Sequence, residues 1–478
     1  MREKTLIEMT RKQLLKCLIA PAAIALLAGA CKPEQQYAPV KDPNSIKLLA
    51  DTVKVTVDKN TVLLTSSLEL GVTYMQHNLD SWNNAASVQR GKTLLTGAVK
   101  YHNQHIFGFG ASSPNPRPGV YNWGSLDERV ALMTSMSATP VITLATAPTW
   151  MTDATWYAGK YANDPNGDDN GDTYWGGVEW APLPAREADF ASLCAKVAAR
   201  YPNVKYFQVW NELKSMWHDA GNHWDYERYT RLYNKVYDSV KKVRPDALIG
   251  GPYVVMDSWI SPPGGANSSI SDPAYGTIDQ RCLDVVTYWL QNKKGADFLC
   301  LDAWGDANDN SNLDVFAATK KFKDISTWLH SKTTLPIWWA EDYIQGGTDT
   351  LRQPAALACM LAYHALGGDA VSLRWSPESQ DGNDNDSNLF TSTQVASTNG
   401  RPGGSPFQNY YLYRDFTKFF PKGTKLYKTT VSSGNVMVVS SATKAMLINK
   451  TSSSQKVKIN NSLNLTLQPY QVYFSTLP

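Results

Sequence analysis

The chain has 478 residues, of which 43% are hydrophobic and 19% charged. This balance is typical of a folded globular protein, and the length suits one large domain with a small one attached. The formal net charge of +3 comes from the basic residues among the first 30, so the remainder is neutral and nucleic acid is not an expected partner.

Residues 1–30 are predicted to be a targeting segment. Basic residues precede an apolar run at 17–30, which is too short to span a bilayer comfortably. The run ends in Leu27-Ala-Gly-Ala-Cys31, which resembles a bacterial lipoprotein signal and implies that Cys31 is the lipidated first mature residue. Ordinary secretion is the alternative, because Ala28-Gly-Ala30 also fits a small-residue cleavage site. We expect an exported protein that meets a membrane only through this anchor, in the periplasm or at the cell surface.

Strands and helices alternate along most of the mature chain. Residues 31–50 are a polar linker, and residues 51–66 alternate apolar and polar positions (Val53, Val55, Val57), as half-buried strands do. Eight further strands are predicted at residues 68–74, 104–109, 140–144, 205–212, 247–252, 297–304, 335–341 and 370–375. The alternation predicts a (β/α)₈ TIM barrel over residues 67–407.

Helical signals separate these strands. A capping box, Ser125-Leu-Asp-Glu128, is expected to begin one helix. Two amphipathic helices follow, one carrying Phe190, Leu193 and Val197 on its apolar face and the other ending at Pro245. Three more are predicted near residues 284–290, 315–329 and 355–366.

From about Asn409 the hydrophobic period changes to two, so residues 408–478 are predicted to form a small all-β sandwich. The strands of residues 51–66 are expected to complete its sheet, which would bring the two ends of the mature chain together. Four cysteines lie in apolar segments without metal-ligand spacing, and we predict buried free thiols at Cys194, Cys282, Cys300 and Cys359.

Two apolar strands end in a glutamate. Tyr206-Phe-Gln-Val-Trp-Asn-Glu212 is one, and Leu335-Pro-Ile-Trp-Trp-Ala-Glu341 is the other. A carboxylate at the C-terminal end of a barrel strand is where this fold keeps its chemistry, although Asn211 and Glu212 alone would also suit a helix cap. Two such glutamates are what a retaining glycosidase needs.

Several motifs resemble clan A retaining glycoside hydrolases, and family 39, the β-xylosidase and iduronidase family, most of all. They are Trp210-Asn-Glu212 followed by an aromatic helix, Ile249-Gly-Gly-Pro252, His105-Ile-Phe107, Tyr121-Asn-Trp123 with Leu126-Asp127, and Ala147-Pro-Thr-Trp150. The resemblance covers about residues 68–378. Two positions depart from the family pattern: Asn103 replaces an arginine, and Asp342 follows Glu341 where an aromatic residue is usual.

The resemblance implies a role for each site residue. Glu212 would be the general acid/base, with a pKa raised by the neighbouring carboxylate, and Glu341 the nucleophile. Asn211 would bind the sugar 2-hydroxyl, and His105 would border the reactive sugar. The remaining expected substrate contacts are Trp375 as the floor of that subsite, with Trp150 and Trp304 lining the cleft.

No cofactor is expected. Residues 164–172, from Asp164 to Asp172, alternate carboxylates like a calcium loop, but they lack the closing glutamate, and a solvated acidic loop is the favoured interpretation. Two other functions stay open: a surface glycan-binding lipoprotein without activity, and a transglycosylase that uses the same covalent intermediate. Both would share the carbohydrate partner.

Overall fold

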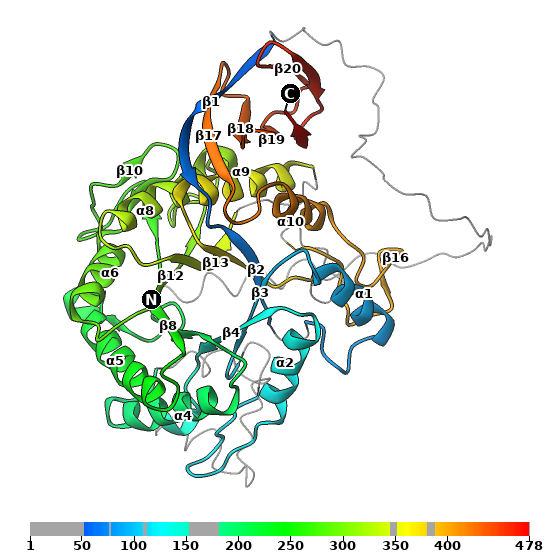
Figure 1. Cartoon of the computed structure of the whole chain (residues 1–478). Coiled ribbons are helices and arrows are strands. Elements are labelled where there is room, and N and C mark those ends of the chain that lie inside the picture. The colour runs from blue at the N-terminus through cyan, green and yellow to red at the C-terminus, as the bar shows by residue number, and fades with distance from the viewer. Residues whose placement is uncertain are drawn as a thin grey trace, which may run out of the picture. The chain divides into compact units, whose positions relative to one another are not determined.

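The computed structural model describes residues 52–75, 78–108, 112–152, 181–344, 351–379 and 388–477. Its centre is a closed barrel of parallel strands, which confirms the predicted barrel (Figure 1). Neighbouring strands around the barrel are, in order, β12 (Phe298–Trp304), β13 (Ile337–Tyr343), β14 (Val371–Trp375), β2 (Glu69–Thr73), β3 (Tyr101–His105), β4 (Thr139–Leu144), β5 (Tyr206–Val209) and β8 (Leu248–Val255).

Helices lie on the outside of the barrel (Figure 1). They are α1 (Ala85–Leu95), α2 (Gly124–Ser135), α4 (Glu187–Arg200), α5 (Tyr226–Val243), α6 (Gln280–Asn292), α7 (Val315–Ala318), α8 (Lys320–His330) and α9 (Arg352–Gly367). Short strands outside the barrel are β6 (Trp217–His218), β7 (His223–Trp224), β9 (Ser258–Trp259), β10 (Ser271–Asp272), β11 (Gly276–Ile278), β15 (Ser397–Thr398) and β16 (Arg401–Pro402).

The barrel interior is packed with large side chains. Phe298 and Trp338 stack there with ring centroids 4.3 Å apart. A Cβ on Gly250 would lie 2.2 Å from the Phe298 ring, and one on Gly251 would lie 2.6 Å from the Tyr229 hydroxyl outside the barrel. Packing on both faces of β8 therefore explains the paired glycines of the Ile249-Gly-Gly-Pro252 motif.

The second barrel strand begins earlier than predicted. It spans Tyr101–His105, whereas the sequence favoured the apolar residues that follow. Its side chains are polar but buried: Asn103, for example, accepts a bond from Thr143 and donates to Thr73 across the neighbouring strands. Polar residues that form hydrogen bonds with one another inside the barrel give no hydrophobic signal. The strand was therefore predicted too far along the chain.

The predicted capping box is wrong. Helix α2 begins at Gly124, with Trp123 as its N-cap and no side-chain cap. The Ser125 hydroxyl instead accepts a hydrogen bond from the backbone N–H of Ser112 at 3.0 Å, which ties the preceding loop to the helix.

The C-terminal region forms two small antiparallel or mixed sheets that share a core. One sheet has the order β17-β1-β20-β21, and the other β18-β19-β22. Val53, Val55 and Val57 of β1 are buried in this core, and β1 pairs with β17 and β20, so the first strand completes the C-terminal sheet as predicted (Figure 1). The strands are β1 (Val53–Thr65), β17 (Lys425–Val431), β18 (Val436–Ser440), β19 (Lys444–Asn449), β20 (Gln455–Ile459), β21 (Leu463–Leu467) and β22 (Val472–Thr476).

A helix, α10 (Gln408–Phe419), stands where strands were expected to begin. Its aromatic residues favour strands. The buried positions Asn409, Leu412, Tyr413 and Phe416 nevertheless follow helical spacing. The helix contacts β2 and α9 on the barrel side and β19 and β22 in the sandwich, so it joins the two parts.

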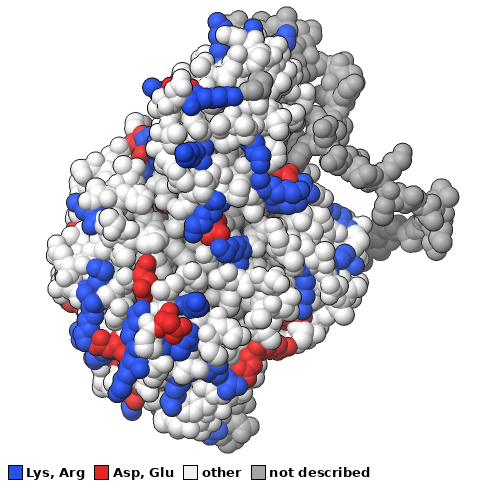
Figure 2. Space-filling model, viewed as in Figure 1, with Lys and Arg blue, Asp and Glu red and all other residues white. Residues whose placement is uncertain are grey.

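The four cysteines Cys194, Cys282, Cys300 and Cys359 are buried and unpaired, as predicted. Within the described ranges, none of the helices combines the length and apolar character that crossing a membrane requires. On the face seen in Figure 2, basic and acidic side chains are interspersed, not gathered by sign.

Candidate active site

Three carboxyl groups meet at the C-terminal mouth of the barrel. They belong to Glu212, just after β5, to Glu341 of β13, and to Asp302 of β12. One oxygen from each lies within 4.8 Å of the others. The structure therefore brings together the two glutamates singled out in the sequence and adds a third acidic side chain.

Two irregularities aim side chains into this mouth. Leu301 pairs with Trp339 and Asp302 with Glu341, so Ala340 is an extra residue that breaks the inward and outward alternation of β13. Tyr253, which has a φ of 53°, is likewise extra in β8 opposite Cys300 and Leu301. Such bulges re-aim side chains at barrel rims, and here they turn Tyr253 and Glu341 towards each other.

The backbone around Glu212 is strained. Trp210, Glu212 and Leu213 all have left-handed conformations, with φ values of 69°, 49° and 49°. These values are costly for residues with a Cβ, and they persist only where surrounding packing enforces them. Trp210 and Leu213 are fully buried, so their packing enforces this backbone conformation and holds Glu212 at the mouth.

Glu341 is 3% exposed and held by two tyrosines. The Tyr253 hydroxyl donates to Oε1 at 2.5 Å, and the Tyr343 hydroxyl donates to Oε2. Burial and the nearby Glu212 charge raise the pKa of Glu341 to about 8, against the lowering effect of both tyrosines. The two donors fix the carboxyl group from both sides.

Glu212 is more open, with 20% of its side chain exposed, and the Lys214 ammonium lies 3.0 Å from its Oε2. Burial raises the pKa of Glu212, but the bond with Asp302 and the Lys214 charge outweigh burial and hold the pKa below its ordinary value of 4.5. This differs from the expectation of a raised pKa, because no local pattern indicates that Lys214 folds back onto Glu212.

Asp302 was missed in the sequence analysis. It is completely buried, and burial together with the charges of both glutamates raises its pKa well above its ordinary value. The signal was present: Phe298-Leu-Cys-Leu-Asp302 is another apolar strand that ends in a carboxylate, like the two that were recognised.

Three predicted substrate contacts form a connected group. His105 Nε2 lies 3.4 Å from Asn211 Oδ1, and the His105 ring meets the Trp375 ring edge-on at 5.9 Å. Burial lowers the pKa of His105 to about 4, so its imidazole is neutral near neutral pH. Asn211 directly precedes Glu212, which places this group beside the carboxyl cluster.

The two remaining tryptophans differ. Trp304 is 44% exposed and stacks on Tyr343 with centroids 4.2 Å apart and planes 13° apart, so it extends the wall beside Glu341. Trp150 instead donates to the Asn115 carbonyl at 2.9 Å and lies under the Arg186 guanidinium. Its described contacts fasten loops together and do not join it to the carboxyl groups.

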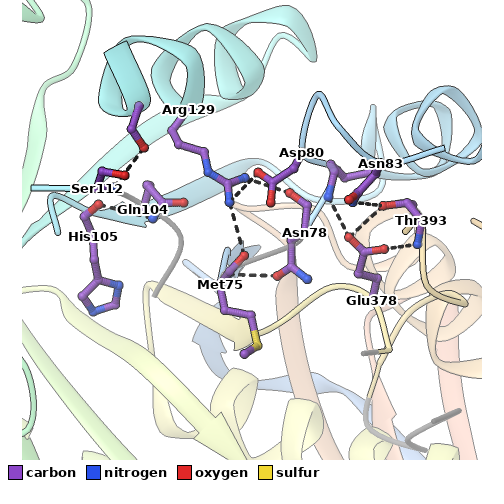
Figure 3. A network of polar contacts seen from close by, with 12 residues as sticks. Met75, Asn78, Asp80, Asn83, Gln104, His105, Ser112, Arg129, Glu378 and Thr393 are labelled. Carbon is purple, nitrogen blue, oxygen red and sulfur yellow. Dashed lines mark hydrogen bonds and ion pairs between the residues drawn. The ribbon is translucent and has the colours of Figure 1, made fainter. Parts of the chain in front are cut away.

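A buried polar network supports the mouth next to His105 (Figure 3). Arg129 of α2 pairs with Asp80 at 2.8 Å, and both side chains are 4% exposed. Glu378 accepts hydrogen bonds from Thr393 and from a backbone N–H of the loop after β2, and burial raises its pKa to about 7. These contacts bind the loops after β2 and β14 to each other, while the His105 ring points away from them (Figure 3).

The oxygens of the carboxyl cluster are close enough for one cation to bridge them. Lys214 already occupies an oxygen of Glu212, and tyrosine hydroxyls occupy both oxygens of Glu341. These contacts would compete with a cation for the oxygens of Glu212 and Glu341. Cys31 and residues 164–172, with the proposed lipidation and calcium sites, lie outside the described residues.

Comparison with known proteins shows that this chain is similar in fold to several solved structures. No protein-family model and no curated protein matches the sequence. Among solved structures, a glycoside hydrolase family 39 enzyme from Xanthomonas axonopodis pv. citri matches with a TM-score of 0.54 and 13% identity, covering 87% of this chain and 83% of that one. A monomeric β-xylosidase from Caulobacter crescentus CB15 matches at 0.53 and 12% identity, covering 85% and 83%.

The catalytic domain of a family 30 xylanase from Talaromyces cellulolyticus matches at a TM-score of 0.51 and 13% identity, covering 85% of this chain and 89% of that one. Similarity at this level concerns the fold. The chain thus has the architecture of clan A glycoside hydrolases of families 39 and 30, in agreement with the resemblance seen in its motifs.

Proposed function

We propose that this chain is a retaining glycoside hydrolase that cleaves O-glycosidic bonds in a polysaccharide or oligosaccharide. The carrying observation is the spacing of Glu212 and Glu341, whose carboxyl oxygens approach within 4.8 Å at the barrel mouth. Retaining enzymes hold their two carboxyl groups about 5–5.5 Å apart, whereas inverting enzymes need about 6.5–9.5 Å to admit a water molecule.

Glu341 is assigned as the nucleophile. It is the more buried of the two, and two tyrosine hydroxyls fix its orientation. A fixed carboxylate can attack the anomeric carbon without first reorganising. Hydrogen bonds from the tyrosines favour the ionised form that the attack requires. Because burial and the Glu212 charge still set the pKa of Glu341 at about 8, the ionised fraction increases towards alkaline pH.

Glu212 is assigned as the general acid/base. Its greater exposure gives it access to the departing alcohol and then to the incoming water. It protonates the leaving oxygen as Glu341 forms the glycosyl ester, and it accepts a proton from water when that ester is hydrolysed. Loss of the Glu341 charge in the ester favours ionisation of Glu212 between these two steps.

The surrounding side chains suit a neutral sugar. Asn211 and the neutral imidazole of His105 offer hydrogen bonds without charge, and Trp375 gives the floor an aromatic face. Asn211 would bind the 2-hydroxyl, a contact that strengthens in the transition state. Trp304 would provide a stacking surface for a neighbouring sugar unit.

β-Xylosides are the substrates to test first, since the similar structures include a β-xylosidase and a xylanase. Export and lipidation at Cys31 would place the enzyme where polysaccharide fragments arrive. Extraction of the full-length protein with detergent, and its release by Cys31→Ser, would test the anchor.

The function is tested with a panel of aryl glycosides and polysaccharides, followed by NMR of the first product formed. A product with the anomeric configuration of the substrate is expected, because two displacements restore it. Inversion would exclude the double displacement. Failure to cleave any substrate, with measurable glycan binding, would favour the glycan-binding alternative. New glycosides formed on addition of a sugar acceptor would identify a transglycosylase.

A further inference from the structure

Asp302 lies in surroundings that an ionised carboxylate does not tolerate. It is 0% exposed, and among the described residues no hydrogen-bond donor reaches either of its carboxyl oxygens. Burying an unpaired carboxylate is far costlier than burying a neutral acid. One oxygen of Glu212 lies within 4.8 Å of one of Asp302, and a hydrogen bond between two carboxyl groups requires a proton on one of them.

The charges that face Asp302 also favour a proton on it. Glu341 is its register partner on β13, and Glu212 completes the cluster. The titratable groups around Asp302 are Glu212, Glu341, Asp257, Lys321, Tyr253 and Tyr343. The cation among them, Lys321 of α8, donates to the Asp306 carbonyl at 3.2 Å, and burial lowers its pKa to about 8 against the opposing charge of Asp257.

Glu341 is a poorer holder of this proton. Both of its oxygens accept hydrogen bonds from tyrosine hydroxyls, and such donors favour the ionised carboxylate. Asp302 has no competing donor of this kind among the described residues, but it has an acceptor in Glu212. The hydrogen-bond donors around them therefore distinguish two carboxyl groups that are both buried.

We infer that Asp302 is a positioning residue that stores the catalytic proton and passes it to Glu212 across their shared hydrogen bond. This inference rests on the proposed glycosidase function. It accounts for a feature that the two-glutamate mechanism leaves open: Glu212, held ionised by Lys214 in the free protein, must be protonated before it can act as an acid.

The proton cycle is balanced. As substrate binds, the O–H bond of Asp302 breaks and an O–H bond forms on Glu212, leaving Asp302 ionised. Glu212 then gives this proton to the leaving alcohol while Glu341 becomes the neutral ester. In the second half, water gives a proton to Glu212 and its oxygen to the sugar, and Glu341 regains its charge. The proton finally returns from Glu212 to Asp302.

The location of the proton can be tested without activity. Infrared difference spectra near neutral pH, between the wild type and Asp302→Asn, are expected to show loss of a protonated-carboxyl C=O band. The band should persist in Asp257→Asn, a neighbouring half-buried carboxyl that serves as the matched control, and in Glu341→Gln. A band that survives Asp302→Asn and disappears in Glu341→Gln would assign the proton to Glu341 and overturn the inference.

Kinetics test the transfer. The amide introduced by Asp302→Asn would still donate an N–H bond to Glu212 but could not release a proton. We expect kcat/KM of this variant to fall about 10- to 100-fold for glycosides with weakly acidic leaving alcohols, and about twofold or less for acidic phenols, which leave without protonation. Equal losses with both leaving groups would show a merely structural role and would overturn the inference.

Glu212→Gln provides a second variant if Asp302→Asn does not fold. Replacing the negative neighbour with an amide N–H donor should weaken or shift the same infrared band, and an unchanged band would contradict the shared bond. If the wild type hydrolyses no glycoside, the proposed function fails on its own. The infrared experiment still decides whether Asp302 holds a proton.

Discussion

Glu341 and Asp342 are neighbours on β13, but their side chains face opposite sides of the barrel wall. Glu341 lies among Glu212 and Asp302, with tyrosine hydroxyls as donors. Asp342 lies outside, where it accepts a bond from Ser372 and lies 3.4 Å from His364 and 3.8 Å from Arg374. Inside the barrel mouth, three acidic groups lie together, whereas outside the wall each acidic group lies beside a basic one.

The outer group is a buried ion network. His364 Nδ1 lies 2.8 Å from Asp369 Oδ2, which also accepts a bond from the Trp339 indole at 2.8 Å. Burial lowers the pKa of His364, but bonds to Asp342 and Asp369 outweigh burial and raise it to about 9. Removing one member of such a network should cost stability, whereas removing a member of the carboxyl cluster should cost activity.

The largest expected effect is on catalysis. Glu341→Gln should lower kcat by about 10⁴-fold or more, because the glycosyl ester can no longer form. Glycan affinity, measured by titration calorimetry, should remain close to that of the wild type. The free energy of unfolding should be unchanged or slightly higher, because a repelled buried carboxyl group is removed. Activity near that of the wild type would exclude Glu341 as the nucleophile.

The next largest effect is on stability. His364→Ala should lower the free energy of unfolding by about 3–5 kcal/mol, since Asp369 would remain buried without its cation and Asp342 would keep only Arg374. Urea denaturation would measure this. His330→Ala, at an exposed histidine on α8, is the matched control and should change stability by less than about 0.5 kcal/mol. Similar losses in the two variants would refute the network's role.

The same histidine predicts a pH dependence. Its pKa of about 9 in the folded protein exceeds its ordinary value of 6.5, so the folded state binds the extra proton. The stabilisation is therefore complete below about pH 6.5 and is lost as the pH rises through about 9, by roughly 3 kcal/mol in all.

Glu341 and Lys321 titrate in the same window, so the comparison has to be made against a variant. The fall in stability from neutral to alkaline pH should be smaller in His364→Gln than in the wild type. Denaturation curves at several pH values would measure it, and parallel pH profiles would show that His364 is not charged in the folded protein.

Sequence reasoning located Glu212 and Glu341 at strand ends of the barrel because an apolar strand that ends in a carboxylate has a readable local pattern. The same pattern was available for Asp302 and was overlooked. The bulge at Ala340 was not readable, since strict alternation would have turned Glu341 outward. Register in a closed barrel depends on the neighbouring strands, and no local pattern encodes it.

Buried polar side chains explain other differences between the predicted and the observed structure. The strand Tyr101–His105 bonds its polar side chains to β2 and β4, so neither a period of two nor an apolar run marks it. Lys214 lowers the pKa of Glu212 because a turn with left-handed residues brings the two side chains together. Packing enforces that turn, and no local sequence pattern predicts it. The positions of the acidic groups were thus predictable from sequence, while their protonation depends on contacts that form in three dimensions.

The smallest expected effect concerns Trp304, which lies on the same side of the barrel wall as Glu341. Among the described residues, no recorded contact joins Trp304 to a carboxyl group of the cluster. Its exposed ring stacks on Tyr343, so in the proposed enzyme it would hold a sugar unit next to the one that is cleaved. Trp304→Ala should raise KM for an oligosaccharide about fivefold, equivalent to about 1 kcal/mol of stacking, with kcat nearly unchanged. Tyr473→Ala, a similarly exposed aromatic residue in the sandwich, should leave KM unaltered. A fall in kcat without a change in KM would instead mean that Trp304 acts through Tyr343 on the orientation of Glu341.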